Sequence, residues 1–310
     1  MKSVAVFAPA SVGNIGPGFD LLGMALANMG DTVVAIQSCQ PGVVIDKITG
    51  DEGRLSYKAD ENTAGIAAHT VLEYLKIRQG IVLTLHKGVP GTGLGSSAAS
   101  AVAASYAVNA LFSGGLSKLE LIPLAAVAES KVSGGFFLDN IGPSMMGGVT
   151  WNNPFTKEVV RLGVISKSVV IVAIPDFMLF TKESRRVLPT AIPMEQFISN
   201  MAYASMMAWS VAMNNAKQFG KSIQDRVVEP ARAPLIHGFD DVKKAAIEAG
   251  ALGCSISGAG ASIFAVTDTG GNAEKIGCAM AAGFKKNGVA CQIKVTRMDR
   301  YGARRVKPKW

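Results

Sequence analysis

The first third of the chain consists of short apolar runs separated by polar stretches. Runs rich in β-branched residues and bounded by Gly or Asp predict strands over 3–8, 32–37 and 43–48. Apolar side chains then recur at helical spacing within residues 62–76, which predicts a helix, and a strand follows over 81–85. The first part of the chain is therefore predicted to form four strands, with a helix before the last of them.

The rest of the chain mixes the two patterns. Helices are predicted over 98–112 and 118–132, and strands over 147–151 and near 159. Further strands are predicted over 169–174, 254–256, 262–267 and 290–295, and further helices over 195–216, 240–249 and 272–286. Because strands and helices interleave without a regular strand-helix-strand repeat, an α+β fold is favoured over a doubly wound sheet.

Length and composition indicate two domains. The chain has 310 residues, of which 49% are hydrophobic, enough for two medium-sized cores. A break in the pattern at Asn152-Asn153-Pro154 predicts the boundary between them. We therefore expect domains over 1–155 and 156–310.

Charge, cysteines and histidines restrict the function classes. The net charge is +8, but residues 297–310 supply much of it, with six basic side chains against Asp299. A solvated basic tail is predicted, with contact to nucleic acid or an acidic surface as the alternative. The four cysteines form no Cys-x-x-Cys pair and the three histidines do not cluster, which argues against zinc and a disulfide scaffold. No run of about eighteen apolar residues exists. We expect a cytoplasmic protein with neither nucleic acid nor membrane as partner.

A glycine-rich loop before the helix over 98–112 is the strongest chemical signal. Gly91, Gly93 and Gly95 allow positive φ and a close approach of the backbone to a ligand. Ser96 or Ser97 is predicted to cap the helix, whose N-terminal amides favour an anion. The spacing matches neither a P-loop nor a dinucleotide turn, so a different phosphate loop is indicated. An ordinary turn before a close-packed Ala/Ser helix is the alternative.

Three segments carry a family resemblance. Residues 90–99, Pro-Gly-Thr-Gly-Leu-Gly-Ser-Ser-Ala-Ala, resemble the second motif of the GHMP kinases. Residues 8–20, Ala-Pro-Ala-Ser-Val-Gly-Asn-Ile-Gly-Pro-Gly-Phe-Asp, are similar to the first motif as homoserine kinases carry it, and residues 255–262, Ser-Ile-Ser-Gly-Ala-Gly-Ala-Ser, resemble the third. Further segments resemble those of homoserine kinases: 129–134, 139–143, 181–185 and 228–232. The resemblance therefore covers nearly the whole chain.

The resemblance implies a fold and a nucleotide site. The fold is the two-domain GHMP kinase fold, with an N-terminal domain like domain 2 of ribosomal protein S5 and a ferredoxin-like C-terminal domain. The implied metal is Mg²⁺, held by Ser97 and Glu129, although Glu129 beside Lys131 could instead be a solvated helix residue. The implied ATP-binding residues are Asn62, Pro90, Gly91, Thr92, Gly93, Leu94, Gly95, Ser96, Ser97, Ala98, Ala99 and Ser100.

An amino-acid acceptor requires an anion for its ammonium group and a cationic fork for its carboxylate. The resemblance places Asn14 and Asp20 at the ammonium, and a guanidinium can bind both carboxylate oxygens at once. The carboxylate residues implied are Arg185 and Arg232. Asn140 is implied near the reacting hydroxyl, and Thr181 and Gly258 on the same substrate side. As alternatives, Asp20 could cap a short helix over 21–24, and Arg185 with Arg186 could form a basic surface.

One segment departs from the family pattern. Homoserine kinases commonly carry His two residues before the Asp-Asn pair, whereas Phe137 stands at this position, between Phe136 and Leu138. These kinases are thought to work without a general base, so Asp139 is not predicted to be one, and acceleration comes from positioning and charge stabilisation.

The resemblance implies a homoserine kinase that uses ATP and Mg²⁺, acts on L-homoserine in threonine biosynthesis, and forms a homodimer. A GHMP kinase for another small polar alcohol and a nucleotide-binding regulator that has lost turnover are the alternatives.

Overall fold

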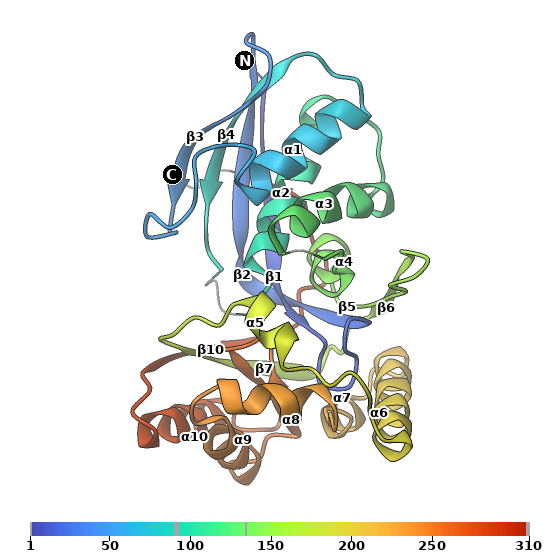
Figure 1. The fold of residues 1–310 in the computed structure, drawn as a ribbon, viewed down its shortest axis with the longest axis vertical. Helices are drawn as coiled ribbons and strands as arrows, with labels where there is room; N and C mark the ends of the chain where they lie inside the picture. Colours follow the sequence, from blue (N-terminus) through green and yellow to red (C-terminus); the bar gives the residue numbers. More distant parts are fainter. Residues whose placement is uncertain (1, 90–92, 134, 308–310) are drawn as a thin grey trace.

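The computed structural model describes residues 2–89, 93–133 and 135–307. Within them, the larger sheet has seven strands in the order β11-β1-β2-β4-β3, with β5 paired to β2 and β6 to β5. Its strands are β1 (Ser3–Gly13), β2 (Leu22–Ser38), β3 (Val43–Thr49), β4 (Gly80–His86), β5 (Val149–Asn152), β6 (Val159–Gly163) and β11 (Arg304–Val306). Four helices cover one face of this sheet (Figure 1): α1 (Thr63–Tyr74), α2 (Ser96–Leu111), α3 (Lys118–Ser133) and α4 (Leu138–Met146).

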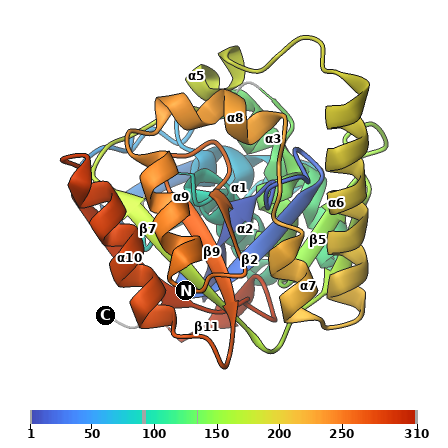
Figure 2. The same ribbon diagram turned by 90° about the horizontal axis from the view of Figure 1, so that it is seen from below.

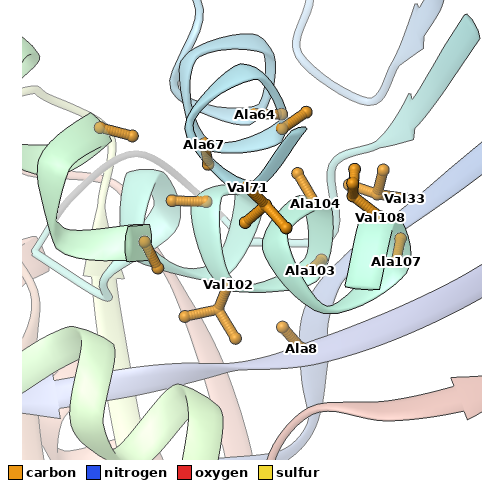
Figure 3. Packing of buried hydrophobic residues seen from close by; sticks show 14 of the residues in the cluster. Ala8, Val33, Ala64, Ala67, Val71, Val102, Ala103, Ala104, Ala107 and Val108 are labelled. Carbon is orange, nitrogen blue, oxygen red and sulfur yellow. The ribbon is translucent and has the colours of Figure 1, made fainter. Parts of the chain in front are cut away.

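Small side chains let these helices pack closely. Ala103, Ala104 and Ala107 of α2 lie in one cluster with Ala64 and Ala67 of α1 (Figure 3). Alanine adds little bulk between the two backbones, which explains the Ala/Ser-rich composition of the segment after the glycine-rich loop.

The smaller sheet has the order β10-β7-β9-β8 and is antiparallel. Its strands are β7 (Ser168–Pro175), β8 (Gly253–Ile256), β9 (Ile263–Asp268) and β10 (Cys291–Thr296). The accompanying helices are α5 (Thr181–Arg186), α6 (Met194–Ala212), α7 (Ala216–Lys221), α8 (Val228–Arg232), α9 (Phe239–Glu248) and α10 (Ala273–Lys286), with a 3₁₀ turn at Ala233–Leu235. Figure 2 shows α6 and α10 at opposite edges of this half. No helix of the described residues is long and apolar enough to cross a membrane.

Side chains that point alternately to the two faces of β7 join the two sheets. Ile171 and Ala173 belong to the cluster that packs against α9 and α10. Val170 and Val172 point the other way, into a cluster that contains Val12 of the larger sheet. The two sheets therefore share a hydrophobic core, and the segments that follow β1 and β7 are held in fixed relation.

The predicted strands and helices are present, with ends that differ by several residues in places. β1 and β2 are longer than predicted, and the helix predicted over 195–216 ends at Ala212, before α7. The break at 152–154 lies in the turn of the β5–β6 hairpin, where Asn153 Oδ1 accepts bonds from the amides of Phe155 (2.9 Å) and Thr156 (3.2 Å). The boundary predicted after residue 155 thus falls inside a hairpin of the larger sheet, and the chain passes to the smaller sheet between β6 and β7.

The prediction of a solvated tail is wrong for the described residues. Residues 304–306 form β11, an antiparallel partner of β1. Arg304 pairs with Asp299 at 3.0 Å and lies over the Phe7 ring at 4.7 Å. Arg305 Nη2 donates to the carbonyl of Ala110 at 3.2 Å. Arg304 and Arg305 therefore have partners inside the fold, whereas residues 308–310 lie outside the described part.

Candidate active site

The glycine-rich loop lies against the other two motifs. Pro90, Gly91 and Thr92 fall outside the described residues, but Gly93 (φ +79°) and Gly95 (φ +66°) both adopt left-handed conformations. A Cβ atom on Gly93 would lie 2.5 Å from the Ser257 carbonyl oxygen, and one on Gly95 would lie 2.1 Å from Ser11 Oγ. Only glycine fits both the backbone angle and the space at these two positions.

The start of α2 differs from the predicted cap. Gly95 is the N-cap residue and supplies no side chain, while Ser96 Oγ donates to the Val89 carbonyl at 3.2 Å. The prediction that Ser96 or Ser97 caps the helix is therefore wrong. Ala99 N donates to Gly95 O at 2.9 Å, which leaves the amides of residues 96–98 in the unpaired first turn. This turn keeps the anion-binding character that the sequence predicts.

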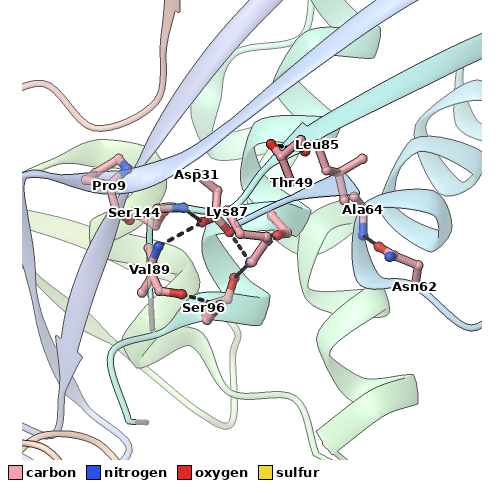
Figure 4. A network of polar contacts seen from close by, with 12 residues as sticks. Pro9, Asp31, Thr49, Asn62, Ala64, Leu85, Lys87, Val89, Ser96 and Ser144 are labelled. Atoms are coloured by element: carbon pink, nitrogen blue, oxygen red, sulfur yellow. Dashed lines mark hydrogen bonds and ion pairs between the residues drawn. The ribbon is translucent and has the colours of Figure 1, made fainter. Parts of the chain in front are cut away.

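A buried ion pair supports the loop from behind (Figure 4). Lys87 Nζ bonds Asp31, the Ser96 carbonyl (3.0 Å) and Ser100 Oγ (2.7 Å). Asp31 Oδ1 accepts from the amides of Gly88 (3.0 Å) and Val89 (3.2 Å). The two charged side chains are only 6% and 1% exposed, so every polar atom here needs a partner inside the protein. The network fixes the entry and exit of the loop.

Several residues predicted to bind ATP have internal roles. Leu94, Ala98 and Ala99 are fully buried, and the Ser100 hydroxyl belongs to the network behind the loop. Asn62 caps α1 by accepting from the Ala64 amide at 3.0 Å and donates to the Ser56 carbonyl at 2.9 Å. These positions shape the loop through packing and backbone.

The predicted metal residues combine hydroxyl and carboxylate oxygens, which are hard donors suited to Mg²⁺. Ser97 lies half-buried in the first turn of α2. Glu129 on α3 is 8% exposed, so it is not the solvated surface acid of the alternative interpretation. Its charge contributes in a small part to the raised pKa of Asp139.

The acceptor side begins at Asn14, which joins the first and third motifs. Its backbone is left-handed (φ +67°), its Nδ2 donates to Gly258 O at 3.0 Å, and its Oδ1 accepts from Asp20 N at 3.0 Å. Gly258 O also accepts from Arg232 Nη1 at 2.8 Å. The Gly258 carbonyl therefore fixes two predicted substrate residues.

Asp20 and Arg185 form an ion pair in the described structure. Arg185 Nη2 lies 2.6 and 2.7 Å from the two carboxylate oxygens of Asp20. The Arg185 guanidinium also lies over the Phe137 ring at 4.0 Å and over the Phe19 ring at 5.2 Å. β2 follows Asp20, so the alternative helix over 21–24 does not form. Arg185, which is predicted to bind the substrate carboxylate, thus orients Asp20.

Arg232 is the buried member of the arginine pair, with 2% exposure. Its Nε donates to Ser184 O at 3.1 Å, and its guanidinium lies 5.3 Å from the Phe19 ring, which it shares with Arg185. Burial, followed by the charge of Arg185, lowers the pKa of Arg232 to about 10. The nearby Arg185 guanidinium therefore disfavours the positive charge of Arg232. A bound anion would offset this repulsion.

The Asp139–Asn140 pair stands at the start of α4. Ser11 Oγ donates to Asn140 Oδ1 at 2.9 Å, and Asn140 Nδ2 lies 3.3 Å from Asp139 Oδ2. Burial, reinforced by the charge of Asp20, raises the pKa of Asp139 to about 7. A Cβ on Gly13 would lie 2.3 Å from Asp139 Oδ2, so the first motif needs glycine to admit this pair.

The phosphate loop meets the acceptor side at Asn140. A Cβ on Gly95 would lie 2.9 Å from Asn140 Oδ1. Thr181 begins α5 and is half-buried, and Ser184 Oγ of the same helix donates to Ala259 O at 2.8 Å in the third motif. An anion-binding helix end thus lies near a cluster of two guanidiniums and two carboxyl groups, which suits transfer between a polyanion and a zwitterion.

Sequence reasoning missed the residues that hold this geometry. They are Ser11, Phe19, Asp31, Lys87 and Ser184. Ser11 and Phe19 stand inside the first motif and Ser184 beside Arg185, so proximity to a motif was their only signal.

Comparison with known proteins identifies the family of the chain. The family model for the GHMP kinases N terminal domain matches residues 62–148, and that for GHMP kinases C terminal matches residues 207–286. A homoserine kinase of Arabidopsis thaliana is 43% identical over 314 residues, covering 98% of this chain and 85% of the relative. The crystal structure of homoserine kinase from Cytophaga hutchinsonii has a TM-score of 0.94 and 41% identity, covering 99% and 98% of the two chains.

A mevalonate kinase of L. major in complex with R-mevalonate has the same fold, with a TM-score of 0.69 and 14% identity over 94% of this chain and 95% of the other. Two family models match the chain, and its similarity to homoserine kinases extends over nearly its full length. The chain belongs to the homoserine kinases of the GHMP kinase family.

Proposed function

We propose that the protein transfers the γ-phosphoryl group of ATP to the side-chain hydroxyl of L-homoserine, giving O-phospho-L-homoserine and ADP for threonine biosynthesis. One observation carries the proposal. Asp20 pairs with Arg185, and Arg185 and Arg232 share the Phe19 ring, while Arg232 bonds the Gly258 carbonyl and Gly258 adjoins Gly93 of the glycine-rich loop, so both charges of an amino acid are offered near an anion-binding helix end.

A free donor on Arg185 supports the assignment of Arg185, together with Arg232, as the carboxylate fork. Among the residues that the structure describes, no acceptor lies within hydrogen-bond distance of the buried Arg185 Nε. A buried donor without a partner is costly, and a substrate carboxylate would remove that cost. Asp20, held by Asn14 and Arg185, is then the anion for the ammonium group.

Asn140 orients the reacting hydroxyl in this proposal, with Thr181 and Gly258 on the same wall. Ser11 fixes the Asn140 amide, and Nδ2, which lies 3.3 Å from Asp139 Oδ2, has a second N–H that can act toward the acceptor. The hydroxyl loses its proton late, toward the phosphate. Rate acceleration comes from alignment and from charge stabilisation by the amides of residues 96–98.

Ser97 and Glu129 are the proposed Mg²⁺ residues, and their oxygen donors fit that ion. When bound, Mg²⁺ would neutralise charge on the β- and γ-phosphate oxygens. The proposed contribution of Glu129 is a buried carboxylate.

An ADP-release assay with homoserine, mevalonate, shikimate and galactose as acceptors tests the proposal. We expect release with homoserine at far higher kcat/KM than with the others. Preference for another acceptor would assign a different GHMP kinase activity. Tight ATP binding without release for any acceptor would indicate a regulator.

We also infer that the protein acts in the cytoplasm as a homodimer, without nucleic acid or membrane partners. Its cysteines are free thiols in the described structure, as is usual in a reducing compartment. Arg304 and Arg305, two of the basic side chains considered for nucleic-acid contact, are engaged within the fold.

A further inference from the structure

Helix α6 has an unusual surface for an exterior helix. It runs for 19 residues from Met194 to Ala212, and Glu195 is its single charged residue. Only Met207, Ser210 and Val211 of the helix are buried. In Figures 1 and 2 it stands at the outer edge of the smaller half. An exterior helix normally turns a polar face to water, whereas α6 turns an apolar one.

The exposed side of α6 carries large apolar side chains with exposures between 40% and 69%. They are Met194, Phe197, Ile198, Met201, Met206, Trp209 and, directly after the helix, Met213. We call this set the α6 face. With roughly 200 Å² for each large side chain, its exposed area is roughly 700 Å². Standard interfaces take about 800 Å² from each partner, while the largest apolar patch of an ordinary monomer is about 300–600 Å².

We propose that the α6 face packs against the α6 face of a second copy of this chain, so that α6 forms the interface of the homodimer inferred above. The exposed Ala202 and Ser205 lie near the middle of the helix, between large residues toward its two ends. Two such helices, related by a twofold axis through this middle, can approach closely there while the large residues of one copy pack beside the partner's.

The charge pattern favours a second copy over a membrane. Helices that lie on membranes carry Lys and Arg on their polar side, and α6 contains neither. Because the α6 face carries no charge, two copies of it can pack together without like-charge repulsion. Its methionines also adapt to one another across the contact.

The inner side of α6 is tied to the acceptor pocket. Asn200 Nδ2 donates to Asp225 Oδ1 at 2.8 Å, and Asn200 Oδ1 accepts from Arg226 N at 2.9 Å. Asp225 in turn accepts from the first amides of α8, at 2.8 to 3.0 Å, and α8 ends at Arg232. Burying α6 in a dimer would therefore steady the helix that carries Arg232.

Mass measurement tests the interface independently of activity, so that failure of the proposed function and failure of the interface are distinguishable. By light scattering, we expect the wild type at twice the chain mass of 32.3 kDa. Met201→Glu and Trp209→Glu should each shift it to the monomer. Phe155→Glu, which alters a side chain 91% exposed in the β5–β6 turn, is the matched control and should remain dimeric.

Cross-linking tests the twofold geometry. In a background with the exposed Cys39 and Cys278 replaced by Ser, Ser205→Cys should form a covalent dimer on oxidation, whereas Glu73→Cys on α1 should not. A monomeric wild type, or a dimer that both glutamate variants leave intact, would overturn the proposal. Binding to phosphatidylcholine vesicles that Trp209→Glu abolishes would assign the face to membranes instead.

The link to Arg232 has its own readout. In the monomeric Trp209→Glu variant, the KM for homoserine should rise severalfold while the KM for ATP stays within twofold. Unchanged values for both substrates would refute the link, and an equal rise in both would indicate general damage to the fold.

Discussion

Phe137 gives the most discriminating test of the acceptor pocket, because it stands where homoserine kinases commonly carry His. Its ring lies 4.0 Å from the Arg185 guanidinium, closer than the Phe19 ring at 5.2 Å. We expect Phe137→Leu to leave the Arg185–Asp20 ion pair without its nearest aromatic support. Arg185 would then sample orientations in which Nε no longer faces the acceptor.

The expected magnitude follows from the exposure of the pair. A cation–π contact contributes about 0.5–1 kcal/mol at exposed sites and about 2 kcal/mol when desolvated. The Arg185 side chain is 33% exposed, and Phe19 and Asp20 still hold it. We therefore expect a loss of about 1 kcal/mol, or about fivefold in kcat/KM for homoserine. Phe137→His keeps an aromatic ring and adds one hydrogen-bonding group worth about 0.5–1.5 kcal/mol, so its kcat/KM should stay within about tenfold of the wild type.

Steady-state ADP release, with homoserine and ATP varied separately, measures both effects. Phe136→Leu is the matched control, since the Phe136 ring lies under Lys157 at 5.1 Å. The reasoning fails if Phe137→Leu and Phe136→Leu lose equal activity, or if the KM for ATP rises as much as that for homoserine. If the wild type ignores homoserine and Phe137→His restores its use, Phe137 marks a changed substrate.

Four further predictions address the other parts of the site. Glu129→Gln should fold and bind nucleotide but lose most turnover, because an amide cannot balance phosphate charge through Mg²⁺; unchanged kcat at ordinary Mg²⁺ would remove Glu129 from the site. Arg232→Ala should cost about 2–5 kcal/mol in homoserine recognition, roughly thirtyfold to several thousandfold, with the KM for ATP unchanged; equal losses for both would place Arg232 on the phosphates. Asp139 has a raised pKa of about 7 in the fold, so its contribution to stability is full below its unfolded pKa of about 4 and falls as pH rises toward 7. Urea denaturation should therefore show Asp139→Asn gaining stability relative to the wild type over that range, and a pH-independent difference would contradict the burial of a titrating carboxyl. Deletion of Tyr301–Trp310 should lower the thermal midpoint by several degrees because it removes β11, whereas deletion of the last three residues should not; equal midpoints would show that β11 adds no stability.

The regular elements could be predicted because their signals are local. Each predicted strand or helix carries its own apolar period, and Gly, Pro, Asn or Asp stands near several of the ends. α4 has no such signal, since Gly142 and Pro143 within nine residues oppose a helix, and packing against β1 and β2 determines it. β11 is three residues long and pairs with a strand almost 300 positions away, so its basic composition suggested a tail.

The residues of the site also divide into those that could be predicted from local sequence and those that could not. Glycines, asparagines and arginines within motifs could be assigned through resemblance, because short ordered segments carry them. The Asp31–Lys87 pair joins residues 56 positions apart, and the contact of Phe137 with Arg185 joins the N-cap residue of α4 to α5. No local pattern encodes such contacts, so they required the fold.

The charges of the pocket explain why an amino acid suits it better than the acceptors of related kinases. Arg185 and Arg232 lie on the same Phe19 ring, and their mutual repulsion contributes to the lowered pKa of Arg232. A carboxylate between them relieves that repulsion, in addition to its hydrogen bonds. Asp20, which already balances Arg185, then becomes available to an ammonium group. A sugar has neither a carboxylate for the arginine pair nor an ammonium group for Asp20. A hydroxy acid without an amine leaves Asp20 without a cationic partner. Only an acceptor that carries both charges therefore pairs with the two arginines and with Asp20 together.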